Sequence, residues 1–372
     1  MLVNSDVDAD ARVQREARSL VAAGHRVRII ALAGRDDGYE VLPVGVTAAV
    51  PNVPKPQHPV GATARASARW ALLPTVMERQ RAAFVSAARS VAATLDPPCV
   101  VHAHDFETLS LGAELADGWD VPLVYDSHEL WSHRVRHGRP TPVRRTRDRA
   151  VEQRLGGRAA AVITVGEEIA GWMRSTFGWT NIDVVRNSFP TMDLPPVEGS
   201  PSGLLYAGRI AEQRDLETVA AAAPDLPLPV VVMGPGDGRL RDRLKRAENV
   251  EVRPPVPVDD VVGAMRRSGI ALVTAADGPL SYRWSLPNKL FQAVQAGVPI
   301  VATDLPAQAR LVHEHDLGCV YRPGAPTSLV AAVDELLADY DRLRDAVEVA
   351  QESLSWNADE RALCDVYARL LR

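Results

Sequence analysis

Short apolar runs alternate with amphipathic stretches along most of the chain. Runs rich in valine, isoleucine and alanine are typical of buried strands, and in the first half amphipathic stretches such as residues 12–23 and 79–95 precede them. This alternation predicts an α/β fold with parallel sheets in doubly wound layers. Strands are expected at Val27–Leu32, Cys99–His102, Pro122–Tyr125, Ala161–Val165, Ile182–Val185, Gly203–Ala207, Pro229–Met233, Val250–Val252, Ile270–Thr274 and Val298–Ala302.

The expected strands fall into two groups, which predicts two Rossmann-like domains. A segment rich in proline, glycine and serine, residues 194–203, separates the groups and is typical of a domain boundary. We therefore predict a first domain over residues 1–189 and a second over residues 190–355. In the remaining segment, 356–372, Trp356 opens a last helix that runs from Asp359 to Leu371.

Residues 285–302 predict a helix start followed by a buried strand. Ser285 is the expected N-cap, Pro287 is tolerated only in a first turn, and Gly297 ends the helix. The amides near Asn288 and Lys289 would then lie at the positive end of the helix, where diphosphates and other anions bind. An ordinary helix–strand unit without a ligand would show the same pattern.

Six segments in the same order resemble one family. SLPNKLFQAVQAGVPIVATDLP, from Ser285, is similar to SLPNKLFEYMAAGxPVVASDLP, the donor-site segment of the retaining glycosyltransferases of family 4, the glycosyl transferases group 1. The resemblance implies the GT-B fold, in which two Rossmann-like domains face each other across a cleft and a last helix crosses back to the first domain. The other segments are RVQREARSLVAAGHRV from Arg12, VVHAHDFETL from Val100, LVYDSHELW from Leu123, LLYAGRIAEQRDLE from Leu204 and VVVMGPGDGRL from Val230.

The resemblance implies a donor site in the second domain. Arg209 and Arg214 follow the strand Gly203–Ala207, and we expect them to bind the diphosphate and stabilise the charge that develops as the sugar departs. Gln292 and Trp284 stand where many family members have glutamates. We expect Gln292 to keep a weakened contact with the ribose. The other expected donor contacts are Gly208, Gly234, Ser285, Leu286, Pro287, Asn288 and Lys289.

The resemblance places contacts with the sugar and the acceptor in the first domain. His104, at the tip of a strand, matches the family histidine that reaches the transferred sugar. We expect acceptor contacts from the loop that follows Pro122–Tyr125, where a purely structural role is an equal alternative, and from the polar segment near the N-terminus. The expected acceptor-side residues are Asp8, Arg12, Asp126, His128 and Glu129.

Neither a cofactor nor a metal ion is expected. Asp6, Asp8 and Asp10 lack the glycine and the glutamate of an EF-hand loop, and the pair His102 and His104 has no evident third ligand in the sequence. By resemblance the departing phosphate itself takes the proton of the acceptor, and a UDP-sugar is expected ahead of a GDP-sugar. A nucleotide-sugar 2-epimerase of similar fold and a nucleotide-binding pseudoenzyme stay open as alternatives.

Composition agrees with a soluble globular protein. The 372 residues carry a net charge of −5, and no apolar run is long enough to span a membrane. Without a signal peptide the protein is expected in the cytoplasm. The arginines between Arg134 and Arg149 predict either a solvated helix face or contact with an anionic acceptor or membrane surface, whereas nucleic acid is not expected. Family members begin with a longer strand than Met1–Asn4, so we expect the recorded start to lie a few residues late.

Overall fold

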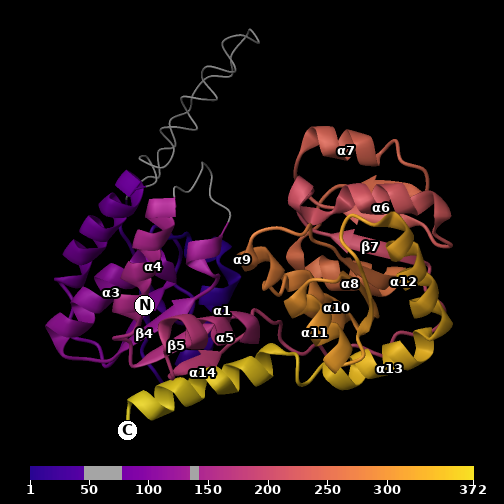
Figure 1. The fold of residues 1–372 in the computed structure, drawn as a ribbon. Coiled ribbons are helices and arrows are strands. Elements are labelled where there is room, and N and C mark those ends of the chain that lie inside the picture. Colours follow the sequence, from indigo (N-terminus) through magenta and orange to yellow (C-terminus); the bar gives the residue numbers. More distant parts are fainter. Residues whose placement is uncertain (46–77, 135–141) are drawn as a thin grey trace. The chain divides into compact units, whose positions relative to one another are not determined.

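The computed structural model describes residues 1–45, 78–134 and 142–372 of the chain, which form two compact units (Figure 1). Unit 1 comprises Met1–Thr164, Ile169–Val184 and Ala362–Arg372. Unit 2 comprises Val165–Glu168 and Val185–Arg361. The division falls at Val184 and Val185, a few residues before the predicted boundary at 189, and the last residues of the chain belong to unit 1.

Unit 2 is built on a six-stranded parallel sheet of order β12-β11-β10-β7-β8-β9. If β7 to β12 are numbered 1 to 6, the order read from the β9 edge is 3-2-1-4-5-6, which is typical of a doubly wound fold. The strand order therefore reverses between β7 and β10. Ligands of such folds bind outside the carboxyl ends of the strands at this switch point. The strands are β7 (Gly203–Ala207), β8 (Val230–Met233), β9 (Val250–Arg253), β10 (Gly269–Val273), β11 (Ile300–Thr303) and β12 (Gly318–Tyr321).

The sheet of unit 1 repeats this order. Leu2 bridges Ile30 on one side and Ala103 on the other, and so joins the pair β1-β2 to the parallel sheet β3-β4-β5-β6. The strand order reverses between residues 1–3 and β3, which places a second switch point at the end of β3. The strands are β1 (Arg28–Ala31), β2 (Glu40–Pro43), β3 (Val101–His104), β4 (Leu123–Ser127), β5 (Ala161–Thr164) and β6 (Ile182–Val184).

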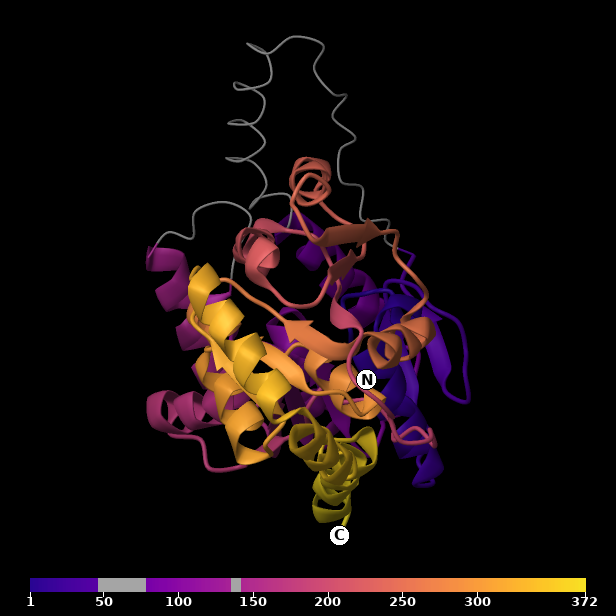
Figure 2. The same cartoon turned by 90° about the vertical axis from the view of Figure 1, so that its right-hand side faces the viewer.

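Alternating side chains of the unit 2 strands are buried on opposite faces of the sheet. Leu205 and Ala207 pack with one core cluster, whereas Leu204 and Tyr206 pack with another. Both faces are therefore covered by helices, and Figure 2 shows the helices around the strands from a second direction. The helices are α6 (Leu216–Ala222), α7 (Gly238–Leu244), α8 (Val258–Ser268), α9 (Leu280–Arg283), α10 (Asn288–Ala296), α11 (Pro306–Glu314), α12 (Pro326–Ala338) and α13 (Tyr340–Ala350).

The last helix of the chain, α14 (Trp356–Leu370), has residues in both units. Near its start, Asp359 binds Arg186 of unit 2, and near its end Arg369 binds Asp183 of unit 1. None of the helices in the described part of the chain is long and apolar enough to cross a membrane. The remaining helices of unit 1 are α1 (Ala11–Ala22), residues 78–92, α3 (Asp105–Trp119), α4 (Pro142–Gly156) and α5 (Glu167–Phe177), whose first residues belong to unit 2.

Two strands of the structure, β2 and β12, were not predicted from the sequence, and a third, β3, was predicted at the wrong residues. β2 and β12 are edge strands; one residue of β2 and alternate residues of β12 are buried, so neither produces a continuous apolar run. β3 begins at Val101 and ends at His104, two residues later than expected, because both histidines are buried within the strand. α14 begins at Trp356 itself and not at Asp359.

Candidate active site

Two histidines of β3 lie side by side in the interior of unit 1. His102 and His104 are two residues apart, so their side chains project from the same face of the strand, and each is 1% exposed. Their rings are stacked, with centroids 4.2 Å apart and planes 13° from parallel. His104 is the last residue of β3, so it stands at the carboxyl end of the sheet, beside the switch point.

A buried arginine joins the two carboxyl groups next to these histidines. Nε of Arg12 lies 2.9 Å from Oε1 of Glu16, one turn further along α1. Arg12 also donates from Nε and Nη2 to the two oxygens of Asp126, at 3.0 and 2.9 Å. Arg12 and Asp126 are buried, so they lie beneath the surface where acceptor contacts were predicted. The reason is that β4 continues to Ser127 and encloses Asp126, which the sequence placed on a loop.

His128, predicted on the acceptor side, is held between two carboxylates. Its Nε2 lies 3.1 Å from Oδ2 of Asp126, and its Nδ1 lies 3.2 Å from Oδ2 of Asp105. Burial alone would lower the pKa of His128, but these two charges raise it well above its usual range. Asp105 has a left-handed φ of 62° immediately after His104, a strained conformation that its bonds to the side chain and amide of His128 stabilise.

The two carboxyl groups beside Arg12 differ in protonation. Burial raises the pKa of Glu16 to about 8, so this group is protonated at neutral pH. Burial would also raise the pKa of Asp126, but the charges of Arg12 and His128 hold it well below its usual range. Asp126 is therefore the ionised member of the pair.

The stacked histidines stay uncharged. Burial lowers the pKa of His102 well below its usual range and also lowers the pKa of His104. Two cations, Arg12 and His128, then face two anions, Asp126 and Asp105, so the charges of these four side chains balance. We call this group the histidine cluster, and its members are Arg12, Glu16, His102, His104, Asp105, Asp126 and His128.

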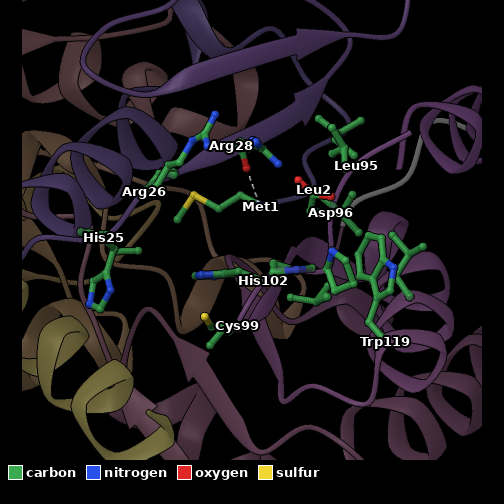
Figure 3. Close-up of a pocket in the computed structure, with 18 of the residues that line it drawn as sticks. Met1, Leu2, His25, Arg26, Arg28, Leu95, Asp96, Cys99, His102 and Trp119 are labelled. Carbon is green, nitrogen blue, oxygen red and sulfur yellow. Dashed lines mark hydrogen bonds between the residues drawn. The ribbon is translucent and has the colours of Figure 1, made fainter. Parts of the chain in front are cut away.

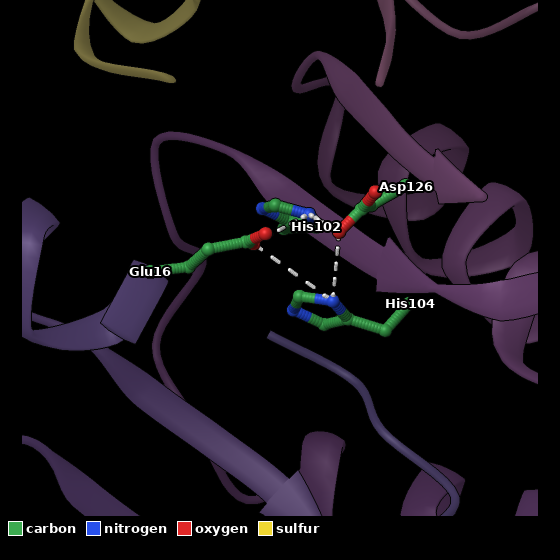
Figure 4. Close-up of side chains that lie close together, drawn as sticks. All are labelled: Glu16, His102, His104 and Asp126. Atoms are coloured by element: carbon green, nitrogen blue, oxygen red, sulfur yellow. Dashed lines mark ion pairs between the residues drawn. The ribbon is translucent and has the colours of Figure 1, made fainter. Parts of the chain in front are cut away.

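The prediction that His102 and His104 lack a third metal ligand is wrong. Glu16 and Asp126 each bring a carboxyl oxygen within 4.0 Å of both imidazoles (Figure 4). Two features oppose a shared metal ion. The lone pairs of stacked, nearly parallel rings do not converge on one point, and Arg12 already pairs with both carboxyl groups. The geometry suits a charge-balanced network better than a metal cage.

A pocket of about 390 Å³ lies in unit 1 next to His102 (Figure 3). Its wall also includes Leu2, Cys99 and Trp119. The hydroxyl of Tyr367, from α14, lies 2.8 Å from Nδ1 of His102, so the last helix holds one member of the stacked pair. Sequence reasoning had no signal for this contact, since 265 positions separate the two residues.

In unit 2 the carboxyl ends of β7 and β8 approach each other through two glycines. Gly208 follows β7, and its amide donates to the carbonyl of Met233 at 2.9 Å. A Cβ atom on Gly234 would lie 1.9 Å from the carbonyl oxygen of Gly208, so no other residue fits there. A Cβ atom on Gly208 would lie 3.3 Å from Nζ of Lys289. The absence of side chains at Gly208 and Gly234, two of the predicted donor contacts, therefore leaves room for a buried ammonium group.

Lys289 places that ammonium group beside the end of β7. Nζ lies 3.8 Å from the centre of the Tyr206 ring and has no hydrogen-bond partner among the residues that the structure describes. The side chain is 7% exposed. Burial, and then the charge of Arg214, lower the pKa of Lys289 well below its usual range. Such a group costs free energy until an anion binds to it.

The helix that carries Lys289 begins later than the sequence predicted. α10 starts at Asn288, with Pro287 at the N-cap in an extended conformation. Ser285 is not the cap, because its hydroxyl donates to the carbonyl of Tyr282 at 3.1 Å, just beyond the short helix α9. The amides of Asn288 and Lys289 thus fall in the first turn, at the positive end of the helix.

The other predicted donor residues of this segment are also built into unit 2. Leu286 is buried in a core cluster, and Oδ1 of Asn288 accepts a hydrogen bond from Asn187 at 2.9 Å. Gln292 lies three residues after Lys289 on α10 and is 7% exposed. Positions three apart share one side of a helix, so Gln292 and Lys289 are neighbours on α10.

The two arginines after β7 have different surroundings. Arg214 ends the short turn Glu212–Arg214, is half-buried, and its carbonyl accepts a hydrogen bond from Thr274 at 2.6 Å. Its charge acts on Lys289, so the two cations lie near each other. Arg209 is exposed. The predicted pair therefore consists of one arginine close to the ammonium group and one in solvent.

The aspartates near the N-terminus have local structural partners. Asp6 accepts a hydrogen bond from the amide of Asp8, and Asp10 caps α1 by accepting from the amide of Val13. The side chain of Asp8 accepts hydrogen bonds from the backbone amide of Arg35 at 3.1 Å and from Nε of Arg35 at 2.8 Å. The predicted acceptor contact Asp8 is therefore engaged within its own loop.

The arginine-rich region is only partly described. Arg134 pairs with the predicted acceptor-side residue Glu129 at 3.0 Å and stacks 3.2 Å from the ring centre of Trp131. Arg136 and Arg139 lie outside the described residues. Three arginines on α4 are exposed: Arg145, Arg147 and Arg149.

Comparison with known proteins identifies the family. The model of the glycosyl transferase 4-like domain matches residues 9–188, and the model of the glycosyl transferases group 1 matches residues 201–339. The chain belongs to the group 1 glycosyltransferases. The 4-like model matches the first predicted domain of the glycosyltransferase, and the group 1 model matches the second.

Similar proteins agree with this assignment. A D-inositol 3-phosphate glycosyltransferase from Paenarthrobacter aurescens is 24% identical over 291 residues, 69% of each chain. Sucrose-phosphate synthase from Thermosynechococcus elongatus superposes with a TM-score of 0.69 at 14% identity, over 96% of this chain and 92% of the other. HepE from Anabaena, solved with UDP and glucose, superposes with a TM-score of 0.65 at 14% identity, over 99% and 98%. The fold of this glycosyltransferase is therefore GT-B, and the epimerase and pseudoenzyme alternatives are not favoured.

Proposed function

We propose that this glycosyltransferase moves a sugar from a nucleoside diphosphate sugar to an acceptor, with retention of anomeric configuration. The buried ammonium group of Lys289 is the observation that carries the proposal. It lies beside the end of β7, near the switch point of unit 2, and no described residue neutralises it. A diphosphate would supply the missing negative charge.

Three further groups suit the same diphosphate. The first amides of α10 form the positive end of the helix, where an anion binds. Arg214 adds a second cation near Lys289. Arg209 is exposed and can bind a further phosphate oxygen. Such cations stabilise the charge that develops on the leaving phosphate. We therefore propose that this chemistry does not depend on a metal ion.

The donor is proposed to be a UDP-sugar ahead of a GDP-sugar. HepE, which shares the fold, was solved with UDP and glucose. On α10, Gln292 lies on the same side as Lys289, where its amide oxygen can accept a hydrogen bond from a ribose hydroxyl. A neutral acceptor forgoes the charge assistance of a carboxylate, so we expect weakened and not abolished nucleotide binding.

The proposed reaction needs no side-chain base. The bond between the anomeric carbon and the phosphate oxygen breaks, and the acceptor oxygen forms its bond to the same carbon on the same face. The departing phosphate takes the proton that the acceptor hydroxyl loses. His104, at the end of β3, is proposed to contact a hydroxyl group of the transferred sugar and so to hold it during transfer.

The acceptor is proposed to carry negative charge or to lie at an anionic surface. Arg145, Arg147 and Arg149 are exposed on α4 of unit 1, and phosphates bind such guanidinium groups well. The similar protein from Paenarthrobacter aurescens is named D-inositol 3-phosphate glycosyltransferase, and its name contains a phosphorylated sugar alcohol. The same arginines would support peripheral contact with an anionic membrane.

Thermal denaturation with UDP, GDP, ADP and dTDP tests the donor site. A nucleotide at about a hundred times its Kd adds roughly 2.7 kcal/mol of stability, which shifts the midpoint by a few degrees. We expect UDP to stabilise the wild type and the control Lys245→Ala, whose lysine is exposed, but not Lys289→Ala. No stabilisation by any of the four, or equal stabilisation of both variants, would remove the support for the proposal.

A further inference from the structure

The hydroxyl group of Tyr367 makes a buried hydrogen bond to which the proposed reaction assigns no role. It lies 2.8 Å from Nδ1 of His102, and the two side chains are 6% and 1% exposed. Leu363 and Tyr367 are one turn apart on α14 and are both buried, so this side of the helix faces the interior of unit 1. The last helix of the chain therefore has a fixed contact with one of the stacked histidines.

The surroundings of the His102 ring assign the direction of this hydrogen bond. Nε2 of His102 lies 3.9 Å from a carboxyl oxygen of Glu16 and 3.9 Å from one of Asp126. An N–H group at this edge of the ring is attracted to both oxygens, whereas a lone pair is repelled by them. The proton of His102 is therefore on Nε2, and Nδ1 accepts a hydrogen bond from the hydroxyl of Tyr367.

Packing alone does not hold the His102 ring in place. His102 and Tyr367 both line the pocket of about 390 Å³ in unit 1, so the ring has open space beside it (Figure 3). Nε2 of His102 has no hydrogen-bond partner among the residues that the structure describes. The bond from Tyr367 to Nδ1 therefore fixes the angle of the ring, and without it the ring could turn into the pocket.

The His102 ring in turn supports His104. The two rings are stacked, with centroids 4.2 Å apart and planes 13° from parallel. On the other side of the contact, Nδ1 of His104 lies 3.3 Å from Oδ2 of Asp126. His104 is therefore held by a carboxylate at one ring nitrogen and by the face of His102, and a turn of His102 would remove the second support.

We propose that Tyr367 is a positioning residue for sugar transfer, which acts through His102 on His104. Its hydroxyl holds the His102 ring flat against His104, and so keeps His104 in the orientation in which it contacts the transferred sugar. This inference rests on the proposed function, because it concerns the same sugar contact. It goes further by giving the last helix of the chain a part in that contact.

Tyr367→Phe removes the hydroxyl and keeps the aromatic ring. Because a displaced His104 would contact the sugar poorly in the transition state, kcat and kcat/KM should fall together, each by about tenfold. Turnover is measured as release of UDP from UDP-glucose, UDP-galactose or UDP-N-acetylglucosamine with water as the acceptor. The Kd of UDP, which is proposed to bind in unit 2, should change by less than about twofold. A kcat within about twofold of the wild type would overturn the proposal.

Tyr340→Phe is the matched control. The hydroxyl of Tyr340 donates to the carbonyl of Gly269 at 3.0 Å, and its side chain is also buried. Gly269 begins β10, at the end of the unit 2 sheet opposite to the one where ligands bind. Both variants lose one buried hydrogen bond, so both should lower the thermal midpoint, but only Tyr367→Phe should lower kcat. Equal losses of kcat would overturn the proposal, because lost stability would then explain them.

A double-mutant cycle with His102→Phe tests the route. Phenylalanine keeps a flat ring on which His104 can stack, but it has no nitrogen for Tyr367 to bind. Tyr367→Phe should therefore lower kcat by less than about twofold in this background. Losses that multiply would overturn a route through His102. Should His102→Phe not fold, the single variants and the following measurement still decide.

Nitrogen NMR of the histidine side chains tests the contact without turnover. With ¹⁵N-histidine labelling, and His102→Gln and His104→Gln to assign the signals, His102 of the wild type should be protonated at Nε2 at pH 7. Tyr367→Phe should mix the two tautomers of His102 and shift the signals of His104. A wild-type His102 protonated at Nδ1, or His104 signals that do not respond to Tyr367→Phe, would overturn the proposal.

The failure of this proposal differs from the failure of the proposed function. A wild type that binds no nucleotide and turns over no sugar donor would reject the proposed function and, with it, a role of Tyr367 in transfer. Normal turnover by Tyr367→Phe would reject the role of Tyr367 and leave the proposed function intact.

Discussion

The histidine cluster of unit 1 differs from the lysine site of unit 2, by which we mean Lys289 with its neighbours Tyr206 and Arg214. The two sites accommodate charged groups in opposite ways. In the cluster, Arg12 and His128 face Asp126 and Asp105, so each of these charges has a partner. In unit 2, Lys289 is buried beside an aromatic ring and near another cation, without a described counter-charge. The first arrangement is complete without a ligand and can fix the position of His104. The second becomes stable only when an anion arrives.

The largest effect is expected from Asp126→Ala, which breaks the balance in unit 1. Buried Arg12 and half-buried His128 would lose their shared partner, at a cost of about 3–5 kcal/mol in the free energy of unfolding. Urea denaturation measures this loss. Asp117→Ala is the control, because Asp117 pairs with Arg158 at the surface and should cost less than about 1 kcal/mol. Equal losses in both variants would contradict a charge-balanced cluster.

Lys289→Met should act in two directions. Loss of a charged hydrogen-bond donor should weaken UDP binding by about 2–3 kcal/mol, which calorimetric titration would record. Without nucleotide, the same variant should be as stable as the wild type or more stable by roughly 1 kcal/mol, since a buried amine without a described hydrogen-bond partner is removed. A variant that binds UDP normally, or that is clearly destabilised without nucleotide, would show that Lys289 has a structural role.

Stability should depend on pH through Glu16. The pKa of this group is raised to about 8 in the folded protein, so between about 4.5 and 8 the folded state keeps a proton that the unfolded state has released. The stabilisation is full below about pH 4.5 and is lost as the pH rises through 8. The thermal midpoint of Glu16→Gln, relative to that of the wild type, should therefore rise as the pH is raised from 5 to 9. A constant difference would contradict the raised pKa.

The smallest effect is expected from Gln292→Glu, which adds a charge to the lysine site. A carboxylate at this position should strengthen the ribose contact by about 1 kcal/mol, or roughly fivefold to tenfold in the Kd of UDP. Gln153→Glu serves as the control, because Gln153 is exposed on α4 of unit 1, and this change should leave UDP binding unaltered. Unchanged or weaker UDP binding in Gln292→Glu would rule out the ribose contact.

The lysine site was largely predictable because its parts follow strands and helix starts. A lysine after Pro287, arginines after β7 and glycines after β7 and β8 are local signals, and parallel strands bring their carboxyl ends to one edge. The helix start itself was misplaced, since Ser285 and Pro287 both resemble starts of a helix. Only the structure shows that the chain stays extended through Pro287.

The histidine cluster was much less predictable. His104, Asp126 and His128 were identified, but Glu16 and Asp105 were missed, and Asp126 was expected in a loop. Glu16 follows Arg12 by one turn and resembles an ordinary surface pair on a helix; that it is buried depends on how α1 packs against β3 and β4. Contacts between distant segments leave no local pattern in the sequence.

Gly234 shows how tolerance to change should be distributed in this enzyme. Every side chain contains the Cβ atom that glycine lacks, and at this position it would collide with the backbone of Gly208. In a library that samples all twenty amino acids at each position, functional clones should therefore retain glycine here, while exposed Arg209 nearby accepts several substitutions with partial activity. A selection experiment would thus outline the proposed donor site by the positions at which no substitution survives.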